Sequence, residues 1–194
     1  MQKIDIRFMN KNEIDFLADF IARGYSDDIF FKWVVPPDSE RHGVLTEYYK
    51  CYLEADEAQV YVAQTGGEIA GATVWLPHDT NPALYEKIEA ATGIFAPNFA
   101  AVADASHKSE PKNTPFTQLV GFAVDKPHRG RGIGSELLRA HLKTQDALGI
   151  PTYAEASTAF HPGNVYGKLG YTRLGELMVF SPKAVLYPLF RAAL

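Results

Sequence analysis

The sequence has few of the features that mark disulfide-bonded, zinc-binding or membrane proteins. It contains one cysteine, Cys51, among 194 residues, which excludes an intramolecular disulfide and a zinc site built on several cysteines. No apolar run approaches the roughly 20 residues that a membrane span requires. The opening stretch, MQKIDIRFMNKNEIDF, also lacks the continuous apolar core of a signal peptide. We therefore expect a reducing, cytoplasmic location and no membrane partner.

Positive charge is also scarce: the sequence has 19 Lys and Arg residues and 23 Asp and Glu residues, so its formal net charge is −4. Phosphate backbones are bound by basic surfaces, so no nucleic-acid partner is expected. The six histidines are scattered without helical or hairpin pairing, and we predict no metal site. The chain is long enough for one domain with a full apolar core, which we place over residues 1–194.

Hydrophobic periodicity predicts strands and helices that alternate along the chain. The clearest local feature is a hairpin at Gly66 and Gly67, which can adopt the positive φ angles of a two-residue loop. Residues 116–157 suggest a strand, a helix and a second strand, a unit that pairs its strands in parallel. The helix ends at Gly149, and its apolar stripe consists of Ile133, Leu137, Leu138 and Leu142. In contrast, residues 97–115 have weak periodicity and suggest a helix fragment and a loop.

These elements favour an α/β fold. Hairpins give antiparallel pairs and the crossover gives a parallel pair, so we predict a mixed, mostly antiparallel sheet. About six or seven strands are expected, the last of them at residues 172–180 and 184–190, with helices flanking the sheet.

The stretch HRGRGIGSELLRAH, which begins at His128, has the composition of an anion site. Its glycines occupy alternate positions between a predicted strand and a predicted helix: Gly130, Gly132 and Gly134. The first turn of a helix leaves N–H groups without partners and carries partial positive charge, and glycine lets an anion approach them. Lys126, Arg129 and Arg131 add formal charge. The loop therefore predicts a site for phosphate or pyrophosphate, and the alternative is a tight turn with solvated arginines.

Two familiar nucleotide motifs fit this loop poorly. The Walker loop needs Gly-Lys-Ser/Thr, which is absent here. The dinucleotide fingerprint needs a third glycine three positions after Gly132, where Ser135 stands. A nucleotide-binding oxidoreductase is therefore the weaker interpretation of the glycines.

The stretch VDKPHRGRGIGSELL resembles the acyl-CoA-binding signature of the GCN5-related N-acetyltransferase (GNAT) superfamily. The pattern Arg/Gln-x-x-Gly-x-Gly/Ala is met by Arg129, Gly132 and Gly134. A second block, YAEAS followed by VYGKLGYTRLGE, is similar to the late strand and short helix of the same family. The resemblance covers residues 116–180 well. More loosely, with ATVWLP and HKSEPKNTPFTQLVGFAV included, the whole chain is similar to the puromycin N-acetyltransferase-like branch.

The resemblance implies a splayed parallel strand pair that holds acetyl-CoA, with no metal. The pantetheine arm would bond to the strand backbone of Phe122, Ala123 and Val124. The pyrophosphate would rest on the amides of the loop and helix start: Arg129, Gly130, Arg131, Gly132, Ile133, Gly134 and Ser135. This cofactor-binding core would span about residues 116–180, and the acceptor-side elements about residues 12–115. Asn164 stands two residues from the family's asparagine position, which Pro162 occupies, and it would contact the cofactor or cap the short helix.

The resemblance also implies the catalytic groups. Tyr166 matches a family tyrosine placed near the thioester sulfur, and a phenol with a pKa of about 10 can protonate a departing thiolate. Its alternative role is to pack the short helix on the sheet. Glu155 is the favoured general base, with Glu110 and His107 as further candidates, and its alternative role is a half-buried carboxylate bonded to the neighbouring strand.

The function expected from this resemblance is acetyl-CoA-dependent acetylation of a primary amine on a small molecule, by direct transfer in a ternary complex. A non-catalytic acyl-CoA sensor is the alternative. O-acetylation and a longer acyl group stay open, as does the choice of monomer or homodimer. The acceptor pocket is expected to lie among aromatic side chains: Tyr25, Phe30, Phe31, Trp33, Phe95 and Phe99. Because DDIFFKW mixes acids with aromatics, Asp27 and Phe31 are candidates to bind a cationic amine.

Overall fold

The structure is a computed structural model that describes residues 3–78 and 82–194. Within these ranges eight strands lie in the order β1-β2-β3-β4-β5-β8-β6, with β7 paired to β8. The strands are β1 (Asp5–Phe8), β2 (Gln59–Thr65), β3 (Glu68–Pro77), β4 (Thr117–Val124), β5 (Thr152–Ala156), β6 (Thr172–Arg173), β7 (Met178–Val179) and β8 (Val185–Arg191). The predicted mixed sheet is confirmed, and the count exceeds six or seven because the predicted strand at 172–180 divides into β6 and β7.

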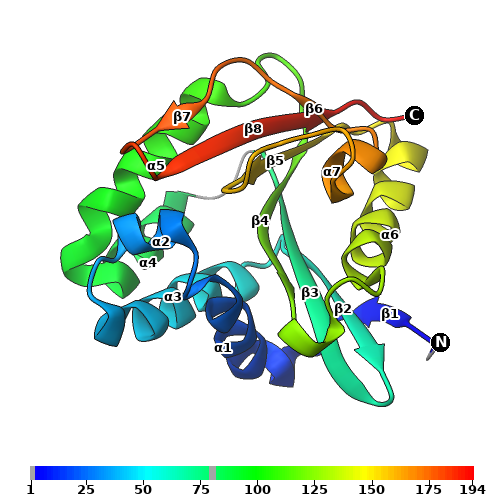
Figure 1. The fold of residues 1–194 in the computed structure, drawn as a ribbon, viewed down its shortest axis with the longest axis horizontal. Coiled ribbons are helices and arrows are strands. Elements are labelled where there is room, and N and C mark those ends of the chain that lie inside the picture. The colour runs from blue at the N-terminus through cyan, green and yellow to red at the C-terminus, as the bar shows by residue number, and fades with distance from the viewer. Residues whose placement is uncertain (1–2, 79–81) are drawn as a thin grey trace.

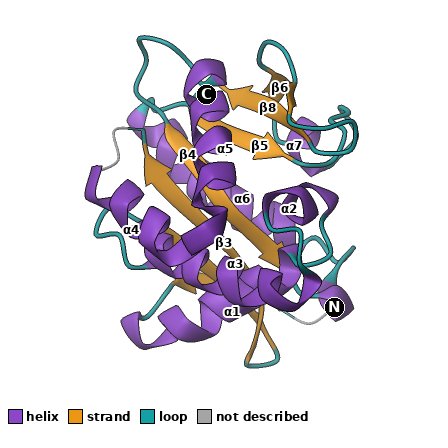
Figure 2. Ribbon diagram, turned by 90° about the vertical axis from the view of Figure 1, so that its left-hand side faces the viewer, coloured by secondary structure: helices purple, strands orange, loops and turns teal. Residues whose placement is uncertain are grey.

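The helices cover both faces of this sheet (Figure 1). They are α1 (Ile14–Tyr25), α2 (Ile29–Val34), α3 (Asp38–Leu53), α4 (Pro82–Thr92), α5 (Ala96–Ser109), α6 (Ile133–Leu148) and α7 (Val165–Lys168). Short 3₁₀ helices lie at Lys11–Glu13, Gly93–Phe95 and Lys126–His128. Helices α1 to α5 lie on one side of the sheet and α6 on the other (Figures 1 and 2).

Each face of the sheet has its own apolar core. On the α1 side, buried residues such as Leu17, Ile21 and Leu45 pack against the sheet. On the other side, the predicted α6 stripe packs on Trp75 and its neighbours. All four predicted residues of that stripe are buried, so the helical periodicity is confirmed.

The hairpin is also confirmed: Gly66 has φ of 61° and Gly67 has φ of 85°, and they join β2 to β3. Residues 97–115 are a helix and a loop, as predicted, and the helix is longer than a fragment because α5 runs for 14 residues from Ala96 to Ser109. The helix is rich in alanine, and of its side chains only Phe99 is buried. An apolar stripe was therefore too weak to show in the sequence.

Strands β4 and β5 are a parallel pair that separates after three residues. The pairing joins Thr117 to Thr152, Gln118 to Tyr153 and Leu119 to Ala154, and it ends there. Beyond this point β4 stays on β3 while all of β5 stays on β8. A bulge shifts the β3–β4 register between Val74 and Trp75, which turns β4 away. The two ribbons diverge in Figures 1 and 2.

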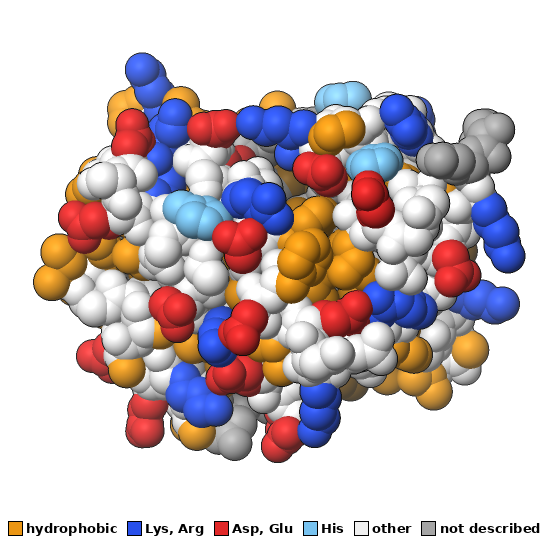
Figure 3. Space-filling view, turned by 90° about the horizontal axis from the view of Figure 1, so that it is seen from below, with side chains coloured by type: hydrophobic (Ala, Val, Ile, Leu, Met, Phe, Trp, Pro, Cys, Tyr) orange, Lys and Arg blue, Asp and Glu red, His pale blue; other side chains and the backbone are white. Residues whose placement is uncertain are grey.

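The surface carries charges of both signs. Figure 3 shows the end of the molecule where α1 and the β2–β3 hairpin lie, and acidic and basic side chains surround a small apolar patch there. Across residues 3–78 and 82–194, no group of three or more His, Cys, Asp or Glu side chains could hold a metal ion. None of the helices in these ranges is both long and apolar enough to cross a membrane.

His141 is a polar residue within the buried face of α6. Its side chain is fully buried, and its ring stacks on Trp75 with centroids 3.8 Å apart. Nε2 lies 2.9 Å from the Thr117 hydroxyl. Burial disfavours the imidazolium ion and lowers the pKa of His141 from 6.5 to about 3.

The shift predicts a loss of stability in acid. The unfolded chain binds a proton at His141 below pH 6.5 and the folded protein does not until about pH 3, so this residue destabilises the fold as pH falls between these values. His141→Gln removes the titration and keeps a hydrogen-bonding group. When the pH is lowered from 7 to 5, we expect the wild type to lose about 2 kcal/mol more of its free energy of unfolding than the variant loses. Urea unfolding of both proteins at the two pH values measures it, and parallel losses would contradict the assignment.

Candidate active site

The glycine loop between β4 and α6 takes a conformation that needs glycine for two different reasons. Gly130 and Gly132 have φ of 75° and 85°, a region that side chains with a Cβ atom rarely adopt. Gly134 lies in the helix, where a Cβ atom would come within 2.8 Å of the Phe122 ring. The alternating glycines therefore shape the turn and also bring the start of α6 against β4.

The loop presents a row of backbone N–H groups. The first hydrogen bond of α6 runs from Glu136 N to Gly132 O at 3.1 Å. Within the described ranges, the amides that precede it have no partner: Gly130, Arg131, Gly132, Ile133, Gly134 and Ser135. The Arg129 amide, by contrast, bonds to Lys126 O at 3.3 Å. Six of the seven predicted amides can therefore meet an anion at the positive end of the helix.

The edge of β4 that faces β5 is exposed where the two strands separate. Asp125 N bonds to Ala70 O on β3, so by strand alternation the Ala123 groups also face β3, and those of Phe122 and Val124 face the gap. Phe122 N donates to the Tyr25 hydroxyl at 3.1 Å. Val124 O accepts a hydrogen bond from Arg129 Nε at 2.9 Å. The Phe122 carbonyl and the Val124 N–H are thus the gap-facing groups left for a ligand.

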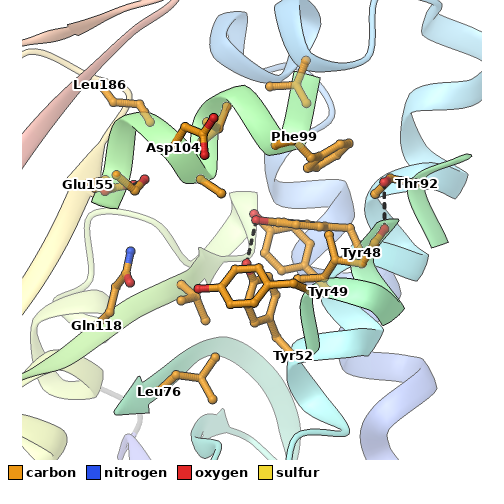
Figure 4. Close-up of a pocket in the computed structure, with 18 of the residues that line it drawn as sticks. Tyr48, Tyr49, Tyr52, Leu76, Thr92, Phe99, Asp104, Gln118, Glu155 and Leu186 are labelled. Carbon is orange, nitrogen blue, oxygen red and sulfur yellow. Dashed lines mark hydrogen bonds between the residues drawn. The ribbon is translucent and has the colours of Figure 1, made fainter. Parts of the chain in front are cut away.

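A cavity of about 710 Å³ lies between α3, α4, α5 and the separated strands. Figure 4 shows Tyr48, Tyr49 and Tyr52 reaching it from α3, with Glu155 on β5 and Gln118 on β4. Its carboxylates are those of Glu89, Asp104, Glu110 and Glu155. Since no lysine or arginine occurs among the described residues that line it, the cavity favours a cation.

The predicted aromatic pocket is only partly correct. Tyr25, Phe30, Phe31 and Phe99 line the cavity, whereas Trp33 packs on Phe180 at 5.0 Å and Phe95 belongs to the core. The suggestion that Asp27 binds the amine is wrong, because it is exposed and pairs with Lys126 at 3.2 Å. The cavity-lining tyrosines of α3 were missed, although Tyr48 and Tyr52 stand at the i, i+4 spacing of one helix face.

Glu155 is held by two hydroxyl donors in the cavity wall. Oε1 accepts from Tyr153 at 2.9 Å, and Oε2 accepts from Ser106 on α5 at 3.0 Å. Both bonds favour the carboxylate, but burial outweighs them, and the nearby Glu110 adds repulsion, so the pKa of Glu155 rises from 4.5 to about 7. A carboxyl group with this pKa can accept a proton near neutral pH.

Tyr166 lies on α7 and also lines the cavity. Its ring packs edge-on against Phe122 and Tyr171, with centroids 6.2 Å and 5.6 Å apart. Burial raises the pKa of Tyr166 well above 10, and Tyr25 adds to the shift. The phenol therefore keeps its proton at neutral pH. Asn164 caps α7, since its Oδ1 accepts from Gly167 N at 3.0 Å; the cofactor contact considered for it stays a prediction.

The other two base candidates reach the same cavity. Glu110 lines it, with an oxygen 3.9 Å from His78 Nδ1. His107 is exposed, and its Nε2 lies 3.2 Å from the Tyr85 hydroxyl. The structure thus brings Glu155, Glu110, His107 and Tyr166 to one cavity, and Glu155 is the member with two hydroxyl donors on its oxygens.

Comparison with known proteins gives one family and a set of similar folds. A model of the acetyltransferase (GNAT) family matches residues 27–171. An HPA2-type histone acetyltransferase and related acetyltransferase from Corynebacterium glutamicum is 20% identical, with a TM-score of 0.73 over 100% of this chain and 98% of that one. Arylalkylamine N-acetyltransferase 2 from Aedes aegypti is 15% identical, with a TM-score of 0.67 and coverage of 99% and 100%. The polyamine N-acetyltransferase of Drosophila melanogaster is 16% identical, with a TM-score of 0.61 and coverage of 97% of each chain.

Proposed function

Because the chain belongs to the GNAT acetyltransferase family, we propose that it moves the acetyl group of acetyl-CoA to a primary amine of a small molecule. The transfer is direct, within a ternary complex. The observation that carries the proposal is the shared cavity, in which a carboxyl group with a pKa near 7 and a protonated phenol line the space beside the separated strands. The likeness to the puromycin N-acetyltransferase-like branch stays a prediction.

The residues present fit acetyl-CoA at two places. The six unpartnered amides at the start of α6 suit its pyrophosphate. The positive φ angles favour glycine at positions 130 and 132, so no side chain from these two residues covers the amides. The Phe122 carbonyl and Val124 N–H suit the amides of the pantetheine arm. When bound, acetyl-CoA supplies an activated acyl carbon with a thiolate leaving group.

Two side chains, Glu155 and Tyr166, then transfer the protons. Glu155 accepts a proton from the ammonium ion, and the nitrogen of the free amine then forms a bond to the acyl carbon. Tyr166 donates its proton to the sulfur as the carbon–sulfur bond breaks, and solvent restores the phenol. The nitrogen loses its second proton to water as the amide forms. The products are an amide, the free thiol and one proton released to solvent.

The cavity supports an amine with an apolar body as acceptor. Four carboxylates and a wall of tyrosines favour a cation with aromatic or aliphatic surface. Two of the similar structures are named for arylalkylamine and polyamine acetylation, which agrees with this chemistry. Such amines, in an assay that detects free thiol, are the first substrates to test.

The amide row predicts a specific effect of Gly132→Ala. An alanine at this φ of 85° strains the backbone by about 1–2 kcal/mol. Its methyl group would either occupy the open space in front of the amides or, if the backbone relaxes, change the direction of the amides. We expect coenzyme A binding to weaken about tenfold by calorimetry. Gly149→Ala is the matched control, since it has φ of 68° at the other end of α6 and should cost similar stability without affecting binding. Equal affinities for coenzyme A in the two variants would show that this loop does not bind the pyrophosphate.

Tyr166→Phe separates an enzyme from a non-catalytic acyl-CoA sensor. Loss of the proton donor should lower kcat about 10²-fold and leave the Kd for acetyl-CoA unchanged. Tyr171→Phe is the control, because it removes a neighbouring buried hydroxyl that accepts a hydrogen bond from Thr152 at 2.8 Å. We expect that variant to lose stability but keep kcat. A Tyr166→Phe protein with normal turnover contradicts the assigned role.

The pH profile should reveal Glu155. The base acts only when ionised, and its pKa is about 7, so kcat should fall about tenfold per pH unit below that value and level off above it. Glu155→Gln should lose about 10²-fold or more in kcat together with this inflection. Glu110→Gln keeps the base and removes a charge that raises its pKa, so its inflection should move to lower pH. An unchanged profile in Glu155→Gln would assign the base elsewhere.

A further inference from the structure

Gln118 is the polar member of an otherwise apolar row on the cavity face of β4. By strand alternation it shares this face with Val120 and Phe122, and all three side chains line the cavity. The Gln118 backbone lies between Leu76 on β3 and Tyr153 on β5, in the part of β4 that is paired on both sides. Its side chain therefore starts from a fixed position in the cavity wall.

The Gln118 side-chain amide has no hydrogen-bond partner within residues 3–78 and 82–194. The side chain is half-buried, and it carries two N–H donors and an oxygen acceptor. In contrast, Glu155 accepts two hydrogen bonds, and the Tyr48 and Tyr52 hydroxyls lie 3.1 Å apart. Figure 4 shows Gln118 on the same side of the cavity as Glu155 and opposite the tyrosines of α3. The amide is thus a polar group of the wall that is left for a ligand.

The position of Gln118 relative to the base sets the length of a ligand that reaches both. Glu155 follows the last residue of β5 that pairs with β4, so along the strands it lies level with Val120, two residues from Gln118. Two strand residues span about 7 Å, which corresponds to about five or six covalent bonds. Phe122 and the Tyr166 ring, with centroids 6.2 Å apart, lie in the opposite direction along β4. An amine at Glu155 therefore has the proposed thioester site at one end and Gln118 at the other.

The amide matches a hydroxyl group better than a charged group. A hydroxyl both donates and accepts, so it can bond to an N–H and to the oxygen of the same amide. An ammonium group can only donate, and it leaves both N–H groups unpaired. A carboxylate is repelled by the acidic side chains that line the cavity, which include Asp104, Glu110 and Glu155.

Resting on the proposed function, we propose that Gln118 is a specificity-determining residue, which binds a hydroxyl group at the far end of the acceptor amine. The acceptor is then a primary amine whose hydroxyl lies about five or six bonds from its nitrogen. Hydrogen bonds between this hydroxyl and Gln118 hold the nitrogen beside Glu155. An analogue with a methyl group in place of the hydroxyl leaves the amide unpaired, and sites with such a polar group discriminate strongly against the analogue that cannot pair with it.

The experiment compares two matched pairs of amines in the assay that detects free thiol. The hydroxylated amines ω-aminopentanol and tyramine are paired with hexylamine and para-methylphenethylamine, in which a methyl group replaces the hydroxyl. In at least one pair, we expect kcat/KM of the wild type to be about 10–100-fold higher for the hydroxylated amine. Gln118→Leu should abolish this ratio. Continued turnover of the methyl analogue shows that the variant is folded.

Thr92→Val is the matched control, because Thr92 also lines the cavity but its hydroxyl already donates to Ile88 O at 2.7 Å. It should leave the ratio at the wild-type value.

The outcomes separate this inference from the proposed function. Equal turnover within both pairs, or a ratio that survives Gln118→Leu, overturns the role of Gln118 alone. Faster turnover of cadaverine, whose far group is a cation, overturns it too, as does an enzyme that acetylates other primary amines and none of these four. A wild type that acetylates no primary amine overturns the proposed function, and this inference fails with it.

Discussion

The early separation of β4 from β5 is the constraint on which the rest of the site depends. A parallel pair would normally satisfy the backbone of both strands along their length, yet here the pairing stops at Leu119 and Ala154. The bulge beside Trp75 and the full pairing of β5 with β8 hold the strands apart. An unpaired strand edge in a protein interior is costly unless another group meets it. The Tyr25 hydroxyl and the Arg129 side chain meet part of this edge, and the remainder is open to a ligand.

The glycine loop extends the same edge into a helix terminus. Gly134 lets α6 begin against the Phe122 ring, on the strand whose backbone faces the gap. The apolar stripe of α6 fixes the helix on the sheet, so that its free amides keep their direction. Backbone groups of β4 and of α6 therefore present one continuous polar surface, whose geometry depends on packing and hardly at all on the identity of exposed side chains.

The sequence was informative where the relevant contacts are local. The hairpin glycines, the α6 stripe and the glycine loop are each defined by neighbouring residues, and each could be predicted. The hydrogen bond between Ser106 and Glu155 joins residues 49 positions apart, and that between Tyr25 and Phe122 joins residues 97 positions apart. No local sequence pattern could predict these two contacts. The bounds of α5 could not be predicted, because its alanine-rich surface faces a cavity and shows no apolar stripe. His141 stands four residues after Leu137 on the buried face, but a histidine does not extend an apolar stripe.

The cavity also helps with the hardest proton transfer of the proposed reaction. An alkylammonium ion that kept its aqueous pKa of about 10.4 in the cavity would give its proton to the Glu155 carboxylate, of pKa about 7, only at a cost of about 4–5 kcal/mol. Inside the cavity the reactants are an ion pair and the products are a neutral amine and a neutral carboxylic acid. Desolvation penalises each buried ion by several kcal/mol, and the same burial already raises the pKa of Glu155. Burial of the amine beside Glu155 therefore favours the neutral pair over the ion pair.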